Sequence, residues 1–322
     1  MREVRYQKID AFSEGIAEGN PAGVVMLEKD QELTPEEMQA IAREQKGTVS
    51  EVVFCTPRGP GTYTLRYYSS ECEVDFCGHG SIACMYSLLH AGPRPPPLEV
   101  VTIETRRGKL PVFDDIDASD AVYISSPEPQ RLPCTVTSRE VSSALGIPEA
   151  HLEGGMELIN AGLRTLLVPL RGLDEVLRTL PDLGVLGAFC RDREVDIVLI
   201  FSKETSLPSS GYRTRVFAPK YGYLEDPATG SGNSALGHCL LDHGMWDGGL
   251  LQIEQGPSLD APNIVRLRTS GPEGGRRVLF GGSAITRWER MLRIDNPGTA
   301  DPLPDTERRI SIGHDDRCLN ER

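Results

Sequence analysis

The chain of 322 residues lacks both the long apolar runs that cross a bilayer and the basic clusters that bind nucleic acid. No stretch approaches the roughly 20 apolar residues that a membrane-spanning helix needs. Asp and Glu outnumber Lys and Arg by 47 to 34, which leaves a net charge of −13. Because nucleic acids and anionic membranes are bound through basic surfaces, neither partner is expected. Residues 1–6 lack the apolar core of a secretion signal, so we expect a cytoplasmic protein.

The sequence also offers little for metals or nucleotides. Its eight cysteines form no CxxC pair, and of its six histidines only His238 and His243 lie close together, at a spacing that does not share one helical face. Residues 78–83 and 230–235 match the loose GxGxxA pattern of dinucleotide-binding turns. However, residues 69–75, before the first match, are too polar for the buried strand that such a fold requires. We therefore expect no metal, no cofactor, and buried thiols for most cysteines.

What the sequence does contain is an alternation of strand and helix patterns, which is typical of a mixed α/β fold. Thr34, Pro35 and Glu37 form a strong helix start, in which Thr34 caps the helix and Glu37 completes a capping box. A turn is predicted at residues 19–23 and a proline-rich connector at residues 92–97. Strands are predicted near residues 4–12, 24–27, 50–54, 63–68, 98–104, 109–113, 165–168, 197–201 and 212–217, and helices at residues 81–89, 138–145 and 233–241.

Two turns rich in small residues, CGHG at 77–80 and TGSG at 229–232, each open a predicted helix. A shift of 152 residues (231 − 79 = 152) superposes them and also aligns the helices that follow. We interpret this match as an internal duplication. The predicted halves are residues 1–125 and 126–285. Residues 296–322 are rich in Pro, Asp, Glu and Arg, and are predicted to form a loosely ordered tail.

The paired turns are candidate binding elements. Glycine lets the backbone approach a ligand closely, and the first N–H groups of the following helix are unpaired and lie at the positive end of its dipole. Two facing turns could therefore hold a substrate carboxylate or a developing enolate between them. The alternative is that these glycines only permit tight turns between strand and helix. The glycines concerned are Gly78, Gly80, Gly230 and Gly232.

Four side chains near these turns are candidates for acid–base chemistry: Glu51, Cys77, His79 and Asp226. Glu51 opens a strand and is followed by three apolar residues. A carboxyl group in apolar surroundings can exchange protons near neutral pH, as a general base for a C–H proton must. The alternative is an exposed glutamate at a strand edge. Cys77 precedes a helix, a position expected to lower its thiol pKa, although it could also be a small residue packed under the turn.

Several motifs occur in order along the chain: GNPAGVV at 19–25, SEVVF at 50–54, EVDFCGHG at 73–80, EDPATGS at 225–231 and VLFGGSA at 278–284. Together they resemble the PhzF-like family of phenazine biosynthesis, within the diaminopimelate epimerase and proline racemase superfamily. The resemblance covers about residues 4–290. It implies an α/β (α+β) fold of two similar domains, each a curved, mostly antiparallel sheet wrapped around a central helix. It also implies that a segment near residues 285–300 completes the first domain, and that the protein is a homodimer.

The resemblance further implies a cofactor-independent isomerase with its site in the cleft between the domains. Glu51 would remove a proton from a small, carboxylate-bearing and possibly cyclic substrate and return it elsewhere. His79, Asp226 and Ser231 would position the polar groups of the substrate and polarise its π-system. The remaining candidate substrate-binding residues are Asn20, Cys77, Gly78, Gly80, Thr229, Gly230 and Gly232.

Two alternatives stay open at this stage. Gly80, Ser81 and Asp75 depart from the usual PhzF-like pattern, and the CGHG turn resembles the proline racemases, which use one cysteine per domain. Thr229 occupies the second position, so racemisation by two thiols is not expected. Cys77 alone could still serve as the base of an amino-acid or hydroxyproline-type epimerase or dehydratase. The other alternative is a binding or interaction protein that retains the fold without turnover.

Overall fold

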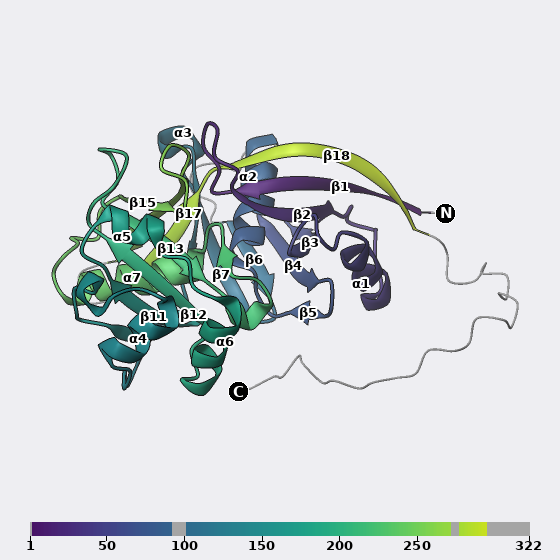
Figure 1. Cartoon of the computed structure of the whole chain (residues 1–322). Coiled ribbons are helices and arrows are strands. Elements are labelled where there is room, and N and C mark those ends of the chain that lie inside the picture. Colours follow the sequence, from purple (N-terminus) through teal and green to yellow (C-terminus); the bar gives the residue numbers. More distant parts are fainter. Residues whose placement is uncertain (1, 92–100, 272–276, 295–322) are drawn as a thin grey trace, which may run out of the picture.

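The structure is a computed structural model that describes residues 2–91, 101–271 and 277–294. It shows a mixed α/β fold in which the N-terminal half, purple to blue, lies beside the second half, teal to green (Figure 1). The predicted connector at residues 92–97 and the predicted tail at residues 296–322 lie outside the described residues. Throughout the described part of the chain, every helix falls short of the length or apolar character that a membrane span requires.

The strands follow one plan twice. In the first half they are β1 (Arg2–Ala11), β2 (Asn20–Met26), β3 (Glu51–Gly59), β4 (Thr62–Ser69), β5 (Glu73–Val74), β6 (Val101–Thr105), β7 (Gly108–Asp114) and β8 (Val122–Ser125). In the second half they are β9 (Gln130–Leu132), β10 (Glu157–Asn160), β11 (Arg164–Pro169), β12 (Ile197–Ser202), β13 (Tyr212–Phe217), β14 (Glu225–Asp226), β15 (Leu251–Gln255), β16 (Asn263–Ser270) and β17 (Arg277–Gly282). The last described strand is β18 (Ala284–Ile294).

The pairing of these strands repeats between the halves and is mostly antiparallel. β2 pairs with β3 and β4 with β6 in parallel, as β11 does with β12 and β13 with β15. β8 pairs with β17 and joins the two halves. β18 returns to the first half and pairs with β1 in antiparallel register, as Figure 1 shows in yellow and purple.

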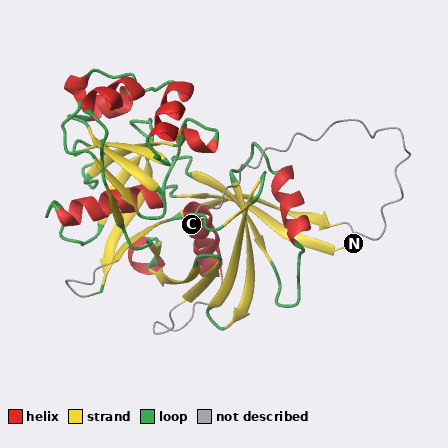
Figure 2. Cartoon of the chain, turned by 90° about the horizontal axis from the view of Figure 1, so that it is seen from below, coloured by secondary structure: helices red, strands yellow, loops and turns green. Residues whose placement is uncertain are grey.

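Each half wraps its strands around a helix, and Figure 2 shows both of these helices among strands. The two helices are α2 (Gly78–Ala91) and α7 (Gly230–Asp242), and most residues of α7 are buried. Smaller helices cover the outer faces: α1 (Pro35–Glu44), α3 (Ile116–Ser119), α4 (Ser138–Leu145), α5 (Leu173–Arg178) and α6 (Leu183–Asp192). The predicted capping box of Thr34 and Glu37 is confirmed at the start of α1.

The structure repeats at the offset read from the sequence. Adding 152 to Gly78, the first residue of α2, gives Gly230, the first residue of α7. The same shift carries β5 onto β14. Two details differ from the predictions: both helices begin three residues earlier than expected, and residues 20–23 lie in β2 instead of a turn.

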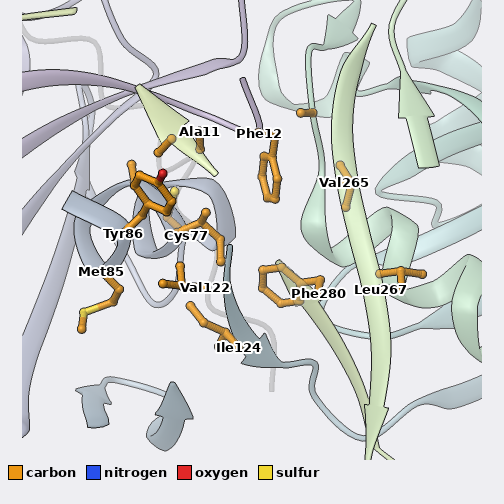
Figure 3. Close-up of a cluster of buried hydrophobic side chains, with 14 of the residues drawn as sticks. Ala11, Phe12, Cys77, Met85, Tyr86, Val122, Ile124, Val265, Leu267 and Phe280 are labelled. Carbon is orange, nitrogen blue, oxygen red and sulfur yellow. The ribbon is translucent and has the colours of Figure 1, made fainter. Parts of the chain in front are cut away.

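Packing against neighbouring side chains, which was not predicted, explains why glycine occupies these positions in the two turns. None of the four has a positive φ, so tight-turn geometry does not require them. The ring of Phe280, on β17, lies against both helix starts: an added Cβ would lie 3.4 Å from it at Gly78 and 2.4 Å from it at Gly230. Figure 3 shows Phe280 facing Phe12 in the core between the halves. Close approach to a shared aromatic ring therefore excludes a side chain at Gly230.

Candidate active site

Glu51, Cys77 and His79 lie together where β3 begins and α2 starts. Nε2 of His79 is 3.4 Å from Oε2 of Glu51, and the Cys77 thiol lies 3.9 Å from the same oxygen. Sγ of Cys77 is 3.5 Å from Nδ1 of His79 and accepts the N–H of Gly80 at 3.3 Å. The side chains of Glu51 and His79 are 21% and 12% exposed, so water or a small substrate can reach both. The structure therefore brings three of the predicted residues into one cluster.

Asp226 belongs to the second half but is held by both halves. Nδ2 of Asn20, at the start of β2, donates to Oδ1 of Asp226 and to the carbonyl oxygen of Ala228, both at 2.8 Å. The Thr229 hydroxyl donates to the other carboxylate oxygen. Asn20 is buried, and its amide nitrogen is occupied by protein acceptors. The structure thus gives Asn20 and Thr229 a part in positioning Asp226, where the sequence predicted contact with a substrate.

Gln255 organises the same turn, although it was not predicted to be a site residue. Its amide nitrogen donates to the carbonyl oxygen of Asp226 at 2.8 Å and to the Thr229 hydroxyl at 3.1 Å. Its amide oxygen accepts the N–H of Thr229 at 3.0 Å and Nδ2 of Asn233 at 2.7 Å. Every polar atom of this buried amide is satisfied within one turn, which fixes the start of α7. Because Gln255 lies on β15, only the fold brings it to the turn.

An ion pair with a buried arginine holds the strand that carries Asp226. Arg215, on β13, pairs with Glu225 at 2.8 Å, and its guanidinium also donates to carbonyl oxygens at the end of α5. The first half repeats this arrangement, since Arg66 of β4 pairs with Glu73 of β5 at 2.8 Å. These pairs attach the short strands β14 and β5 to their neighbours, immediately before the two turns.

The surroundings raise the pKa values of two acidic groups of the site, Cys77 and Asp226. Burial, followed by the nearby Glu51 carboxylate, raises the pKa of the Cys77 thiol well above its ordinary value. The prediction of a lowered Cys77 pKa is therefore wrong, because desolvation outweighs the helix start and the single N–H of Gly80. Burial also raises the pKa of Asp226, against the opposing effects of the His79 imidazole and of the hydrogen bonds from Thr229 and Asn20.

Ser231, the remaining predicted catalytic residue, stands apart from this cluster. Among the described residues, no hydrogen bond joins its hydroxyl to Glu51, His79 or Asp226. Ser231 is part-buried and lies beside Gly162, where an added Cβ would be 3.7 Å from the Ser231 Cβ. It therefore faces a loop of the second half, between β10 and β11.

Two tyrosines lie on the segment between β13 and β14, shortly before Asp226. The ring centroids of Tyr221 and Tyr223 are 6.5 Å apart, and both side chains are exposed. Desolvation, followed by the carboxylates of Asp226 and Glu51, raises the pKa of Tyr223. Both phenols therefore stay protonated at neutral pH.

Within the described part of the chain, two groups of side chains could hold a metal ion. The ligand atoms of Glu51, Cys77 and His79 lie within 4.8 Å of one another, as do those of a second group on the far end of α7. The second group is Glu157, Cys239 and His243. In the site group the sulfur is a protonated thiol, which is a poor metal ligand until it loses its proton. No sequence pattern indicated the second group, because Glu157 comes from β10 and the other two residues from the end of α7.

Comparison with known proteins places the chain in a family. The sequence profile of the phenazine biosynthesis-like proteins (PhzC-PhzF) matches residues 9–290. The chain belongs to this family. An uncharacterized isomerase of Bacillus subtilis, YfhB, is 29% identical over 298 residues, covering 91% of this chain and all of the relative. A trans-2,3-dihydro-3-hydroxyanthranilate isomerase of Pseudomonas fluorescens is 29% identical over 287 residues, covering 87% of this chain and 96% of that enzyme.

Solved structures agree with this assignment. The PhzF-family phenazine biosynthesis protein of Bacillus anthracis superposes with a TM-score of 0.80 at 25% identity, covering 91% of this chain and 100% of that one. A hydroxyproline epimerase of Agrobacterium vitis, solved with bound trans-4-hydroxy-L-proline, superposes with a TM-score of 0.57 at 15% identity, covering 91% of each chain. The second likeness shows the shared fold alone. The chain is thus an isomerase of the PhzF family with the fold predicted from its motifs.

Proposed function

We propose that this PhzF-family isomerase moves a proton on a small carboxylate-bearing substrate with Glu51 as the acid–base group. The observation that supports this most is the placement of Oε2 of Glu51 3.4 Å from Nε2 of His79 and 3.9 Å from the protonated Cys77 thiol. In the proposed step Glu51 takes a proton from one carbon of the substrate, the electron pair of that C–H bond shifts into the π-system, and Glu51 returns the proton to another carbon. Atoms and electrons balance without an external oxidant or reductant.

The other residues of the site receive supporting roles in this proposal. His79 hydrogen-bonds a substrate oxygen that gains charge when the proton leaves, and Asp226 binds a polar group from the opposite side. The first N–H groups of α2 and α7, at Gly78, Gly230 and Ser231, would hold the carboxylate, because helix starts favour anions. The elevated pKa keeps the Cys77 thiol protonated at neutral pH, so little thiolate is present to act as a base, which argues against an epimerase or dehydratase that depends on it.

The proposal includes the division of the chain at residue 125. Residues 126–285 form the second domain, and a segment near residues 285–300 completes the first. The site lies between them, since Asn20 of one half binds Asp226 of the other. A homodimer, as is usual in this family, is part of the proposal.

The test measures turnover of trans-2,3-dihydro-3-hydroxyanthranilate and of related cyclic acids, together with deuterium uptake from D2O by NMR. We expect Glu51→Gln to lower both rates by about 10³-fold or more, which is the scale of a lost acid–base group. Cys77→Ala should stay within about tenfold of the wild type, and Cys190→Ala, a free buried cysteine of α6, serves as its control. Loss of turnover in Cys77→Ala with retention in Glu51→Gln would overturn the proposal.

A further inference from the structure

Three side chains meet at the far end of α7, outside the candidate active site. They are Glu157 of β10, Cys239 of α7 and His243, which follows α7 directly. Their carboxylate oxygen, thiol sulfur and imidazole nitrogen lie within 4.8 Å of one another, and Nε2 of His243 is hydrogen-bonded to Oε1 of Glu157. Cys239 lies nine residues after Gly230 (239 − 230 = 9), which is about 14 Å along the helix from the second turn. This group is therefore separate from the cluster around Glu51.

The two ligands from α7 lie on one face of the helix, because they are four residues apart. The N–H of His243 donates to the carbonyl oxygen of Cys239 at 3.1 Å, so the helical hydrogen bonding extends to this position. Cys239 is 4% exposed, whereas the side chains of Glu157 and His243 are 29% and 53% exposed. A buried sulfur below two partly exposed ligands forms a group that an ion can enter from solvent.

The chemistry of the three ligands suits a divalent transition metal. A thiolate, an imidazole and a carboxylate are the side chains that bind zinc in proteins. The neighbouring cation Arg131, on β9, forms an ion pair with Asp242. Glu157 faces His243, and an imidazole can itself be a metal ligand. A cation between the two would bind both groups.

At the equivalent positions the first half lacks these ligands. The shift of 152 residues takes Cys239 to Ser87 and His243 to Ala91 of α2 (239 − 152 = 87, 243 − 152 = 91). Neither of these residues offers a sulfur or an imidazole. The repeated fold therefore does not itself require a thiol and an imidazole at the end of its central helix.

We infer that Glu157, Cys239 and His243 form a binding site for zinc or a similar divalent transition metal, which ties the end of α7 to β10. A tetrahedral zinc ion, with bonds of about 2.0–2.3 Å, holds its ligands roughly 3.5 Å apart. A small rotation of the half-exposed His243 side chain provides this spacing. Water would complete the fourth position. The inference goes beyond the proposed function, since the metal takes no part in proton transfer there.

The thiol must lose its proton when the metal binds. Burial, followed by the nearby Glu157 carboxylate, raises the pKa of Cys239 to about 12, so the metal-free group contains a thiol. Its proton passes to solvent as the metal–sulfur bond forms, because a bound cation deprotonates its thiol ligand. No metal was expected from the sequence, where only the spacing of His238 and His243 was considered.

Cobalt(II) absorption spectroscopy of the full chain tests the site directly. The protein is reduced and freed of metal with a chelator, which is then removed. An equimolar amount of Co²⁺ should produce thiolate-to-cobalt charge-transfer absorption in the near ultraviolet, which Zn²⁺ abolishes. Cys239→Ala should remove this absorption. His243→Ala, at an exposed position, should weaken Zn²⁺ binding by about 100-fold or more, since loss of a residue that only supports a ligand already costs about 10- to 100-fold.

Two control variants separate this site from other thiols and imidazoles. Cys77→Ala removes the thiol of the group around Glu51, and His151→Ala removes another histidine of the second half. Both should keep the absorption and the Zn²⁺ affinity. Zn²⁺ should raise the unfolding temperature of the wild type and leave that of His243→Ala unchanged. No charge-transfer absorption in the wild type, undiminished absorption in Cys239→Ala, or its loss in Cys77→Ala would overturn the inference.

Discussion

The two turns share one sequence pattern, yet the fold constrains them differently. In the first turn the crowded glycine is Gly80, where an added Cβ would lie 2.6 Å from Cγ2 of Val53. In the second turn the crowded glycine is Gly230, against Phe280. An added Cβ at Gly232 would lie 3.2 Å from its nearest neighbour, Cδ1 of Ile197. The first turn carries the reactive side chains, and the second holds Asp226 in place. The two turns therefore share a backbone arrangement but differ in packing and chemistry.

The largest effect is expected where the second turn is crowded. Gly230→Ala places a methyl group into the Phe280 ring, so we expect a loss of about 3 kcal/mol in the free energy of unfolding, or failure to fold. Gly232→Ala should lose about 1 kcal/mol or less, because it meets only the flexible end of Ile197. Urea unfolding followed by circular dichroism measures both variants.

In the first turn we expect the second glycine to be the more sensitive one. Gly80→Ala should lower the free energy of unfolding more than Gly78→Ala, because an added Cβ at Gly78 would lie 3.4 Å from the Phe280 ring. Equal losses at the first and second glycines of both turns would show that backbone conformation, instead of packing, selects glycine here.

The next largest difference concerns the two equivalent ion pairs. The side chain of Arg215 is 3% exposed and that of Arg66 is 30% exposed. Arg215→Ala removes a buried guanidinium that also donates to the carbonyl oxygens of Val176 and Leu177, so we expect a loss of about 3 kcal/mol in the free energy of unfolding. Arg66→Ala should cost about 1 kcal/mol, because the Arg66 guanidinium is already partly in contact with water. Thermal unfolding of both variants measures the difference, and similar losses would contradict the asymmetry.

A third comparison is between His238 of α7 and Tyr86, its equivalent in α2 at the same offset (238 − 86 = 152). Burial lowers the pKa of His238 to about 4, and its Nε2 lies 3.1 Å from the Ser126 hydroxyl. The unfolded chain therefore takes up this proton first as the pH falls, and stability is lost from about pH 6.5 downward. The loss should reach about 2 kcal/mol between pH 6.5 and 5.

His238→Asn removes this titration, so the difference in unfolding free energy between it and the wild type should shrink across the same range. Tyr86→Phe changes no group that titrates there and should run parallel to the wild type. Unfolding in urea at several pH values measures both. If the unfolding free energy depends on pH in the same way in His238→Asn and in the wild type, His238 does not remain neutral in the folded protein.

The smallest expected effect is a gain in stability at residue Asp226. Because the pKa of Asp226 is raised, its contribution to stability is full below the ordinary aspartate pKa and is lost as the pH rises through the folded value. Asp226→Asn should therefore unfold about 2 °C higher at pH 7, corresponding to roughly 1 kcal/mol, and the gain should vanish near pH 4. Calorimetry at both pH values tests this, with the exposed Asp174→Asn as control. A lower unfolding temperature at pH 7 would show that the hydrogen bonds from Asn20 and Thr229 outweigh burial.

The sequence predicted the parts of this molecule that depend on local patterns. The capping box at Thr34, the two central helices and their offset follow from neighbouring residues, and ordered motifs identified the family and its fold. The shared location of Glu51, Cys77 and His79 was predicted because all three belong to those motifs.

What the sequence could not predict depends on contacts between distant segments. Gln255 contacts the second turn through the pairing of β13 with β15, which no local pattern encodes. The direction of the Cys77 pKa was wrong because burial, a property of the whole fold, outweighs a helix start. The reason for Gly230 was missed because Phe280 lies fifty residues further along the chain (280 − 230 = 50).

The pairing of β1 with β18 sets the order in which the protein can be completed during synthesis. Arg2 pairs with Ile294 and Ala11 with Ala284. β1 therefore cannot pair on this side until β18 has been synthesised. Until residues 284–294 leave the ribosome, the outer edge of β1 carries unpaired backbone groups that attract other strands. The second half, β9 to β17, can pair earlier. The N-terminal half is therefore synthesised before the second half, but its sheet is completed last. A chain that terminates before β18 would lack the partner of β1.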